Sequence, residues 1–226
     1  MVGSRVAGTP VEYILGWAEF CGLRIAVDTG VFVPRRRTEF LVRQAIALAS
    51  RHAGVRDPVV VDLCCGSGAI GAAVLAALPR LELFAADIDP SAVRCARVNL
   101  PNLRSNVFEG DLYDALPARL RGRVDVLVAN APYVPSDAMR TMPPEAREHE
   151  PAVALDGGHD GLEVQRRIAA DAASWLAPGG HLVVETSRHQ AQQGLRIFRR
   201  NGLSARVMES ATFDATVVVG TRPATE

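Results

Sequence analysis

Short, continuously apolar runs alternate along this chain with longer segments in which apolar residues recur at helical spacing. Short apolar runs rich in β-branched residues are typical of strands that are buried on both faces of a parallel sheet. Such runs stand at Val59–Leu63, at residues 81–86, at residues 105–108, where the signal is weaker, at Val124–Ala129 and at residues 181–186. The pattern therefore predicts a core of parallel strands in the middle of the chain.

The segments between these runs have the apolar spacing of helices. Helices are predicted at residues 38–51, 69–78, 91–99, 161–176 and 190–201. Near the C-terminus, residues 203–208 and 216–220 are two further apolar runs that are expected to pair as an antiparallel hairpin. The predicted fold class is therefore α/β, a doubly wound, Rossmann-like sheet with a terminal antiparallel hairpin.

The first part of the chain has a different pattern. Residues 1–37 are expected to form an N-terminal lead-in with a short β-hairpin. Its strands are predicted at Val11–Leu15 and residues 23–27, its breaks at Gly16 and Gly22, and a further extended piece at residues 31–33. A single catalytic domain is expected over residues 38–226. No internal repeat or linker divides it.

Two further local features concern the course of the chain. Thr38 precedes the first predicted helix and is expected to cap it, since a threonine oxygen can accept from the first free backbone N–H groups. Residues 134–160 contain four prolines and are predicted to be a long irregular segment. A loop of this length inside a compact domain usually has a function.

The most informative stretch joins the first two predicted strands. Asp62 lies near the end of the first strand, and the motif Gly66-x-Gly68-x-x-Gly71 follows before the helix begins. Glycines at such a turn let backbone N–H groups approach a ligand where a Cβ would clash. Asp87, at the tip of the second strand, is placed to accept hydrogen bonds from a ribose diol. This order predicts a site for an adenosine-containing cofactor.

Two cofactors fit that pattern. A nicotinamide dinucleotide would place its pyrophosphate at the N-terminus of the helix, and the three glycines match its fingerprint. S-adenosylmethionine has no phosphate but carries an ammonium group. Asp62 supplies a negative charge for an ammonium and would repel a pyrophosphate, so its spacing from Gly66 favours S-adenosylmethionine. The glycines are also compatible with a simple βαβ crossover in which they serve only close packing.

The tetrapeptide Asn130-Ala131-Pro132-Tyr133 follows the fourth predicted strand, beside the cofactor loop. An amide or aromatic amine nitrogen attacks poorly because its lone pair is delocalised. The Asn130 side-chain oxygen can accept one N–H hydrogen, and a backbone carbonyl of Asn130 or Ala131 the other, which frees the lone pair for a methyl group. Pro132 fixes the backbone, and Tyr133 offers a flat face to a planar group. An ordinary turn is the alternative, since Asn and Pro are common turn residues.

Composition and charge argue against several classes of function. The 226 residues carry no net charge, and all 25 basic residues are arginine, so no global field attracts the chain to nucleic acid or an anionic membrane. The four cysteines form no C-x-x-C pair and the five histidines show no ligand spacing, so no metal site is expected. No apolar run approaches about 18 residues, and no signal peptide is evident. The protein is therefore expected to be cytoplasmic and to have no membrane partner.

Several separated motifs, in order, resemble those of the protein-(glutamine-N5) methyltransferases that modify release factors and ribosomal proteins. The matching stretches are Pro10-Val11-Glu12-Tyr13-Ile14-Leu15-Gly16, Val33-Pro34-Arg35-x-x-Thr38-Glu39, Asp62-Leu63-Cys64-Cys65-Gly66-Ser67-Gly68, Asn130-Ala131-Pro132-Tyr133, and Glu150-Pro151-Ala152-x-Ala154-Leu155-x-Gly157-Gly158-x-Asp160-Gly161-Leu162. The resemblance covers the chain from about Pro10 onward. It implies a seven-stranded class I S-adenosylmethionine-dependent methyltransferase that acts on a glutamine side-chain amide of a protein such as a release factor.

The resemblance also implies site residues. The cofactor would be bound by Asp62, Cys64, Cys65, Gly66, Ser67, Gly68, Asp87, Ile88, Asp111, Leu112 and Asn130. The substrate would be bound by Asn130, Ala131, Pro132 and Tyr133, of which Asn130, Pro132 and Tyr133 are the expected catalytic residues. Cys64 and Cys65 are interpreted as small side chains beside the ligand, because no histidine stands at a spacing that suggests a nucleophilic pair.

Three departures from the family pattern stand out. Ala131 replaces the first proline of the tetrapeptide, Arg36 stands where the lead-in often has proline, and the family's N-terminal helical domain does not precede the lead-in. Three alternative functions stay open. The acceptor is the exocyclic amine of adenine in DNA or RNA, which neutral charge disfavours, or the protein is a nicotinamide oxidoreductase, or it is a non-catalytic cofactor-binding paralogue.

Overall fold

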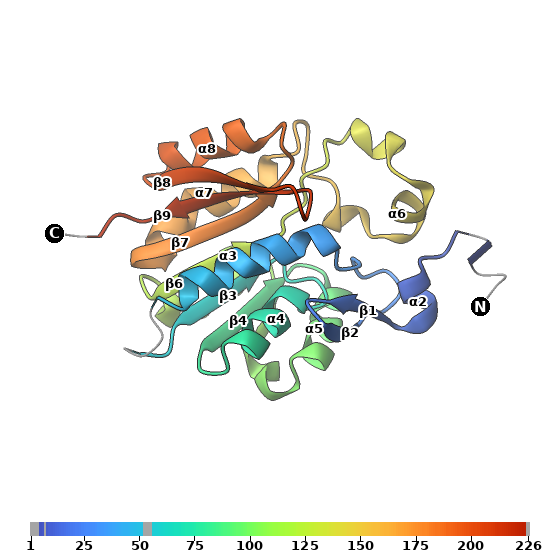
Figure 1. The fold of residues 1–226 in the computed structure, drawn as a ribbon, viewed down its shortest axis with the longest axis horizontal. Helices are drawn as coiled ribbons and strands as arrows, with labels where there is room; N and C mark the ends of the chain where they lie inside the picture. The colour runs from blue at the N-terminus through green and yellow to red at the C-terminus, as the bar shows by residue number, and fades with distance from the viewer. Residues whose placement is uncertain (1–4, 7, 52–55, 225–226) are drawn as a thin grey trace.

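A seven-stranded sheet forms the centre of the computed structural model, which describes residues 5–6, 8–51 and 56–224 (Figure 1). In order across the sheet, the strands are β5 (Val107–Glu109), β4 (Glu82–Asp87), β3 (Val59–Leu63), β6 (Val124–Ala129), β7 (Leu176–Thr186), β9 (Ala215–Thr221) and β8 (Ser204–Ser210). The strands from β5 to β7 are parallel, whereas β9 is inserted antiparallel between β7 and β8. The predicted α/β fold with a terminal antiparallel hairpin is confirmed.

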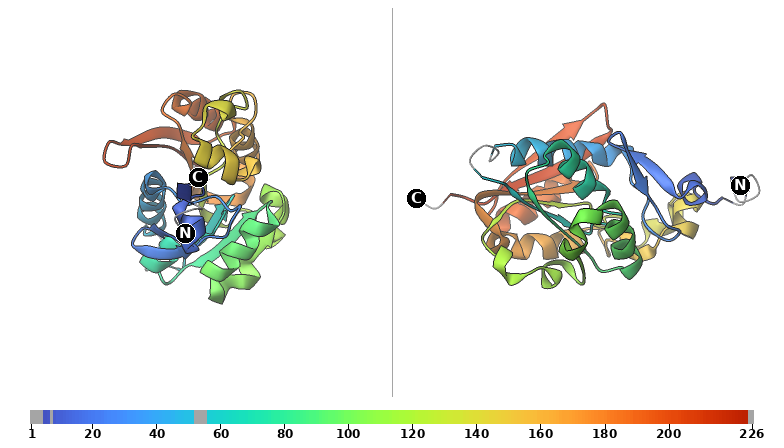
Figure 2. Two further views of the ribbon diagram at one scale, coloured as in Figure 1. Left: turned by 90° about the vertical axis from the view of Figure 1, so that its right-hand side faces the viewer. Right: turned by 90° about the horizontal axis from the view of Figure 1, so that it is seen from below.

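Helices cover both faces of this sheet (Figure 2). One face packs against α3 (Glu39–Ala49), α4 (Ala69–Ala77) and α5 (Pro90–Asn99), and the other against α7 (Glu163–Trp175) and α8 (Ala191–Arg200). Successive side chains of a strand point to opposite faces. Val60 of β3 therefore joins the first cluster, and its neighbours Val59 and Val61 join the second. This double coverage explains why the central strands are apolar at almost every position.

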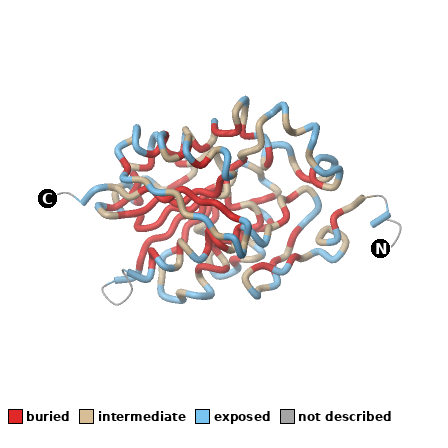
Figure 3. The backbone as a smooth tube through the Cα atoms, turned by 45° about the horizontal axis from the view of Figure 1, so that its top comes forward, coloured by how far each residue is buried: buried red, intermediate tan, exposed pale blue. Residues whose placement is uncertain are grey.

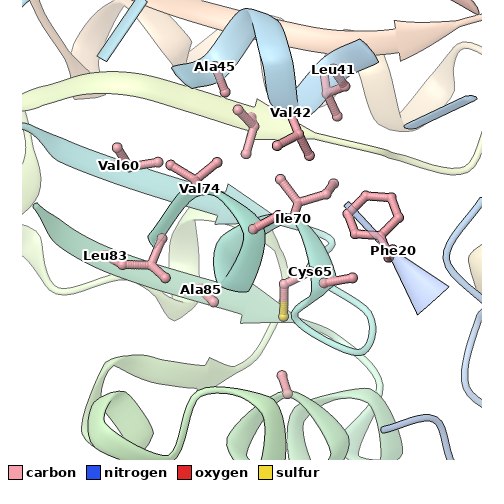
Figure 4. Packing of buried hydrophobic residues seen from close by; sticks show 14 of the residues in the cluster. Phe20, Leu41, Val42, Ala45, Val60, Cys65, Ile70, Val74, Leu83 and Ala85 are labelled. Atoms are coloured by element: carbon pink, nitrogen blue, oxygen red, sulfur yellow. The ribbon is translucent and has the colours of Figure 1, made fainter. Parts of the chain in front are cut away.

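Burial is concentrated in the strands and in the helix surfaces that face them (Figure 3). Figure 4 shows the first cluster, where Leu41 and Val42 of α3 and Ile70 and Val74 of α4 meet Val60 of β3. Burying an aliphatic side chain of this size contributes about 1.5–3 kcal/mol to folding. Packing on both faces therefore holds the ends of the central strands in fixed positions.

The registers of the parallel strands bring their carboxyl ends to one edge of the sheet. Leu63 of β3 pairs with Ala86 of β4 and with Ala129 of β6, and Ala129 pairs with Val184 of β7. The residues that follow these positions therefore lie side by side, although they are far apart in the sequence.

The lead-in differs from the prediction. Val11–Leu15 is a short helix, α2, rather than a strand, and β1 (Trp17–Phe20) takes its place as the partner of β2 (Leu23–Ala26). The apolar residues from Val11 to Leu15 also fit helical spacing, and Pro10 and Gly16 suit the two ends of a helix. The left-handed backbone of Gly16 lets its N–H bond to Glu12. Residues 31–33 belong to no strand of the structure.

Several boundaries also differ. Thr38 does not cap α3, because a 3₁₀ turn, η1 (Arg36–Thr38), begins two residues earlier and Thr38 is already helical, with φ of −66°. The strand predicted at residues 105–108 is β5, which begins only at Val107 because the residues before it form a 3₁₀ segment, η2 (Pro101–Asn106). The strand predicted at residues 181–186 begins earlier, since β7 starts at Leu176, and its pairing with β6 shifts register between Val124 and Val126.

Residues 134–160 are not irregular throughout. They contain η5 (Ala138–Thr141), α6 (Pro144–His149) and η6 (Ala152–Ala154), and they lie beside the lead-in on the right of Figure 1. The Arg35 guanidinium donates to both oxygens of Glu150 at 2.7 Å, and the Val33 N–H donates to the same carboxylate at 3.2 Å. The Tyr13 hydroxyl lies 3.4 Å from the backbone oxygen of His149, to which it can donate. These contacts join the two segments over the carboxyl edge of the sheet.

In the part of the chain that the structure describes, no helix is both long and apolar enough to cross a membrane. The same residues contain no group of three or more His, Cys, Asp or Glu side chains arranged to hold a metal ion.

Candidate active site

A cavity of about 220 Å³ opens at the carboxyl ends of β3, β4 and β6. The loops after these strands form its floor, and the lead-in and residues 134–160 form its walls. In a doubly wound sheet this edge is where ligands bind. The lining residues are Phe20, Phe32, Pro34, Thr38, Cys64, Cys65, Gly66, Ser67, Ala69, Ile70, Ala86, Asp87, Ile88, Asp89, Ala92, Asp111, Leu112, Asn130, Pro132, Pro151, Val153, Ala154, Asp156, Val164 and Arg167.

The glycine loop after β3 is held from several sides. Gly68 has a left-handed φ of +75°, and a Cβ at this position would lie 3.1 Å from the Cβ of Ala96 on α5. Only glycine permits this approach of the loop to α5. Asn99 of α5 donates to the backbone oxygens of Ser67 at 2.8 Å and Ala26 at 2.9 Å, so one side chain connects the loop with the lead-in.

Asp87 lies at the end of β4 and shapes the same loop. Its Oδ2 accepts from Gly66 N–H at 2.8 Å, and its Oδ1 accepts from Asp89 N–H at 2.9 Å. Burial raises the pKa of Asp87, while these backbone donors act in the opposite direction. A carboxylate oxygen has two lone pairs, so Asp87 retains acceptor capacity toward the cavity.

Asp62 is not brought into the cavity lining. It is fully buried, and its Oδ2 accepts from Gly71 N–H at 3.0 Å, at the start of α4. Its Oδ1 has no hydrogen-bond partner in the described part of the chain. Desolvation, assisted by the charge of Asp87, raises the pKa of Asp62 to about 7. The Asp62 carboxyl therefore supports the first turn of α4, and the ammonium contact that the sequence suggests stays a prediction.

Two charged side chains of the cavity lining pair with each other. Asp111 accepts from the Arg167 guanidinium at 2.6 Å, and both residues belong to the lining. Leu112, which follows Asp111, has a left-handed φ of +46° that turns the chain out of β5. Positive φ is uncommon for a residue other than glycine, and such strain is often found at ligand sites.

Asn130 lies directly after β6, and its side chain reaches η1. Its Nδ2 donates to Thr38 Oγ1 at 3.4 Å, whereas no group in the described part of the chain donates to its Oδ1, which can therefore accept from another donor. Pro132 is buried and lines the cavity, whereas Ala131 and Tyr133 do not line it. The Tyr133 hydroxyl donates to Glu185 Oε1 at 3.4 Å. The structure thus places the Asn130 amide and the glycine loop around one cavity.

The chain matches a family model described as "Methyltransferase small domain" over residues 24–145. It is 38% identical over 204 residues to a release factor glutamine methyltransferase from Geobacter sulfurreducens, covering 89% of this chain and 69% of the relative. With its counterpart in Streptomyces coelicolor it shares 40% identity over 198 residues, covering 88% and 70%. The chain belongs to the release factor glutamine methyltransferase family.

Not every similar protein has that name. A protein from Streptomyces pristinaespiralis named 4-amino-L-phenylalanine/4-methylamino-L-phenylalanine methyltransferase is 38% identical over 203 residues, covering 89% of this chain and 69% of its own. Among solved structures, a release-factor-specific protein-(glutamine-N5) methyltransferase from Alicyclobacillus acidocaldarius has a TM-score of 0.51 at 24% identity, covering 84% of this chain and 94% of that one. A Pyrococcus furiosus methyltransferase has a TM-score of 0.65 at 16% identity, covering 97% and 98%. These structures support the class I methyltransferase fold.

Most of the predicted site residues meet at this cavity of the glutamine methyltransferase fold. Those in the lining are Cys64, Cys65, Gly66, Ser67, Asp87, Ile88, Asp111, Leu112, Asn130 and Pro132, and those outside it are Asp62, Gly68, Ala131 and Tyr133. Burial raises the pKa of the thiols of Cys64 and Cys65, so both are neutral near pH 7. A neutral thiol is a poor nucleophile, which agrees with their interpretation as small lining side chains.

Sequence reasoning missed the residues that the lead-in contributes. Phe20 and Phe32 supply the aromatic rings of the lining, and Phe20 lies close to Ile70 in Figure 4. Thr38 and Arg167 were also missed as lining residues. The family lead-in motif contains Thr38 and was a usable signal for that residue, but nothing local to Phe20 or Arg167 indicates a distant cavity.

Proposed function

We propose that this chain transfers a methyl group from S-adenosylmethionine to the side-chain amide nitrogen of a glutamine in a protein, with a peptide chain release factor as the leading candidate. The observation that carries the proposal is the position of Asn130. Its side-chain oxygen is available at the tip of β6, and the cofactor loop after β3 lines the same cavity. Family membership supports the reaction, since relatives at 38% and 40% identity are named release factor glutamine methyltransferases.

The residues fit this cofactor. Gly66 and Gly68 keep the loop free of side chains, as close approach of a ligand requires. In this proposal Asp87 accepts from the ribose hydroxyls, and Asp111 with Leu112 lies beside the adenine. When bound, S-adenosylmethionine supplies an electrophilic methyl group on sulfur. The neutral lining at Cys64 and Cys65 adds no charge that would compete with this sulfonium.

The chemical role of the protein is to orient the acceptor. Asn130 Oδ1 accepts one N–H of the glutamine amide, and a backbone carbonyl of Asn130 or Ala131 accepts the other. The nitrogen lone pair then points toward the methyl group. Because the alkylated nitrogen becomes acidic, its extra proton leaves without a strong base. In this arrangement Pro132 holds the loop, and Tyr133 anchors it through its hydroxyl bond to Glu185.

The test uses a release factor that carries the Gly-Gly-Gln motif. Incubation of the protein with S-adenosylmethionine is expected to add one methyl group to the motif glutamine, as measured by peptide mass spectrometry. Asn130→Ala is expected to lower kcat by about 10²–10³-fold, the usual effect of removing one oriented polar group. Cofactor affinity, measured by calorimetry, should change much less.

Asn201→Ala is the matched control. It removes the same side chain from the end of α8, where Asn201 Nδ2 donates to the backbone oxygen of Ile197 in the same helix. Its kcat should equal that of the parent protein. An Asn130→Ala enzyme with unimpaired turnover would refute the assigned role.

A second candidate acceptor is a small aromatic amine. The Streptomyces pristinaespiralis relative, 38% identical, carries an aminophenylalanine in its name, and Phe20 and Phe32 give this cavity aromatic walls. The same orienting acceptors suit both nitrogens, because each lone pair is delocalised. Assays with 4-amino-L-phenylalanine and with adenine-containing RNA, run beside the release factor, distinguish the acceptors by where the methyl group is found.

A further inference from the structure

Glu185 is a buried acid next to Asn130, and so far its one assigned role is to accept the hydroxyl of Tyr133. Ala129 of β6 pairs with Val184 of β7 in a parallel register. The next residues, Asn130 and Glu185, are therefore neighbours at the carboxyl edge of the sheet. Glu185 is only 3% exposed. A buried carboxylate is costly unless nearby groups stabilise it, so its position beside the catalytic loop requires an explanation.

The groups around Glu185 come from two separate segments. Its Oε1 accepts from the Tyr133 hydroxyl at 3.4 Å and lies 3.6 Å from Nε of Arg37, whose guanidinium also lies over the Tyr133 ring at 5.9 Å. Burial raises the pKa of Glu185, and Thr38, Arg37 and Tyr133 each act in the opposite direction. Its Oε2 has no hydrogen-bond partner among the described residues. The ionised carboxylate therefore still has room for one more donor.

Thr38 stands between this carboxylate and the catalytic amide. Its oxygen accepts from Nδ2 of Asn130 at 3.4 Å. The residue before it, Arg37, reaches Glu185 Oε1 at 3.6 Å, and a hydrogen bond from the Thr38 side chain lowers the pKa of Glu185. A hydroxyl has a single hydrogen to donate. If an ionised carboxylate attracts that hydrogen, the Thr38 oxygen can only accept from Asn130.

The Asn130 side-chain amide can adopt two orientations, which exchange Oδ1 and Nδ2. The restriction on Thr38 selects one of them. With Nδ2 turned to Thr38, Oδ1 of Asn130 faces the acceptor nitrogen, whereas the opposite orientation would present a donor to another donor. We propose that Glu185 is a positioning residue that acts through Thr38 to keep the Asn130 side-chain oxygen directed at the methyl acceptor. The proposal rests on the proposed function, because it assigns the supporting group for the same reaction.

The decisive variant is Glu185→Gln. The glutamine keeps the shape of the side chain, but its amide can donate to Thr38, so the hydroxyl hydrogen turns to Asn130 and the Asn130 amide reverses. We expect kcat to fall by roughly 10–100-fold, as is common when a partner that orients a functional group is lost. KM for the acceptor and the affinity for S-adenosylmethionine should change by less than about threefold. Thr38→Val should lower kcat to a similar extent, and Thr38→Ser should restore most of it.

The double variant tests whether Glu185 and Thr38 affect kcat through the same chain of contacts. If Glu185 acts through Thr38, combining Glu185→Gln with Thr38→Val should lower kcat no further than either change alone. Two effects that multiply would overturn the proposal, as would an unchanged kcat for Glu185→Gln.

The pH profile gives a readout that a purely structural role would not produce. Protonation of Glu185 should lower kcat on the acid side, above the pH at which an exposed glutamate titrates, because burial raises the pKa of Glu185. The pKa of Tyr133 is raised to about 12, and arginine side chains such as Arg37 keep their charge in proteins, so neither accounts for an acid limb. The raised pKa values of Asp62 and Asp87 are common to both proteins, so the readout is the difference between their two pH profiles. The ratio of the parent kcat to the Glu185→Gln kcat should fall as the pH drops through the range in which Glu185 takes up a proton. A ratio that stays constant with pH would contradict the proposal.

Asp125→Asn is the matched control. Asp125 is also a buried acid paired with an arginine, Arg56, but it lies at the amino end of β6, about 16 Å from the strand tip. It should lower the free energy of unfolding without lowering kcat. A folding defect in Glu185→Gln would appear in the same unfolding measurement.

One measurement needs no methyl acceptor and separates this proposal from the proposed function. The side-chain NH₂ resonances of Asn130 can be assigned by their loss in Asn130→Asp. They should shift in Glu185→Gln, and they should stay at the parent positions in Thr38→Ser, which keeps the hydroxyl. If these resonances behave so while no release factor is methylated, the acceptor is misassigned and the positioning role stands. If the release factor is methylated and the resonances are unchanged in Glu185→Gln, the positioning role is wrong.

Discussion

The raised pKa of the buried Asp62 carboxyl leads to a quantitative prediction of how stability depends on pH. Asp62 is fully buried, one of its oxygens lacks a partner among the described residues, and its pKa is raised from 3.8 to about 7 in the folded protein. That difference corresponds to about 4 kcal/mol, at 1.36 kcal/mol for each pH unit. The sign follows from proton linkage. Between about pH 4 and pH 7 the folded state holds a proton that the unfolded state has released, so stability falls as pH rises through this window.

Asp62→Asn removes the titration and keeps the shape of the side chain. The free energy of unfolding of the variant minus that of the parent protein should therefore increase by about 4 kcal/mol between about pH 4 and about pH 8, because only the parent loses stability. Urea unfolding at a series of pH values measures this difference. Burial also raises the pKa of Asp87, but that residue is present in both proteins, so the comparison isolates Asp62. A difference that stays constant with pH would refute the reasoning.

The same experiment with saturating S-adenosylmethionine tests the ammonium contact that the sequence suggests. A cation near Asp62 would lower the pKa of this carboxyl and flatten the pH dependence. We expect the dependence to persist, because the Asp62 carboxyl is turned toward Gly71 and does not line the cavity.

Three further predictions concern the walls and supports of the cavity. Arg35→Leu leaves the buried carboxylate of Glu150 without its guanidinium partner, and we expect a loss of about 2–3 kcal/mol in urea unfolding, reduced from the usual buried-pair cost because Arg35 is partly exposed; an unchanged midpoint would contradict this. Gly157→Ala places a Cβ 2.7 Å from the carbonyl oxygen of Pro132, so stability should fall by about 1–3 kcal/mol and kcat with it, and a fully active variant would show that the loop adjusts freely. Tyr113→Phe removes a buried hydroxyl that donates to a main-chain oxygen at 2.8 Å; we expect thermal unfolding to report a loss of about 1–3 kcal/mol with unaltered kcat, and a change in kcat would place this residue in the active site.

The pattern of apolar residues was sufficient to predict the central strands of the sheet. Val59–Leu63 and Val124–Ala129 are strands with the predicted bounds, because apolar runs of that length are stable only when buried on both faces. The glycine loop and Asn130 were found for a related reason, since the ends of parallel strands meet at one edge whatever the rest of the chain does. The lead-in was less predictable, because the spacing of Val11–Leu15 suits a strand or a helix and only the pairing of β1 with β2 excludes the strand.

What the sequence by itself determined is thus the fold class, the motif family and the residues that follow the strand tips. The tertiary structure alone decided which side chains face the cavity and which support it. Asp62 and Glu185 are both acids in apolar strands, and no local pattern reveals that one turns into the sheet toward α4 while the other lies beside Asn130. The approach of Thr38 to Asn130 joins residues 92 positions apart. Contacts over such separations depend on how whole elements pack, which the spacing of residues along the chain does not encode.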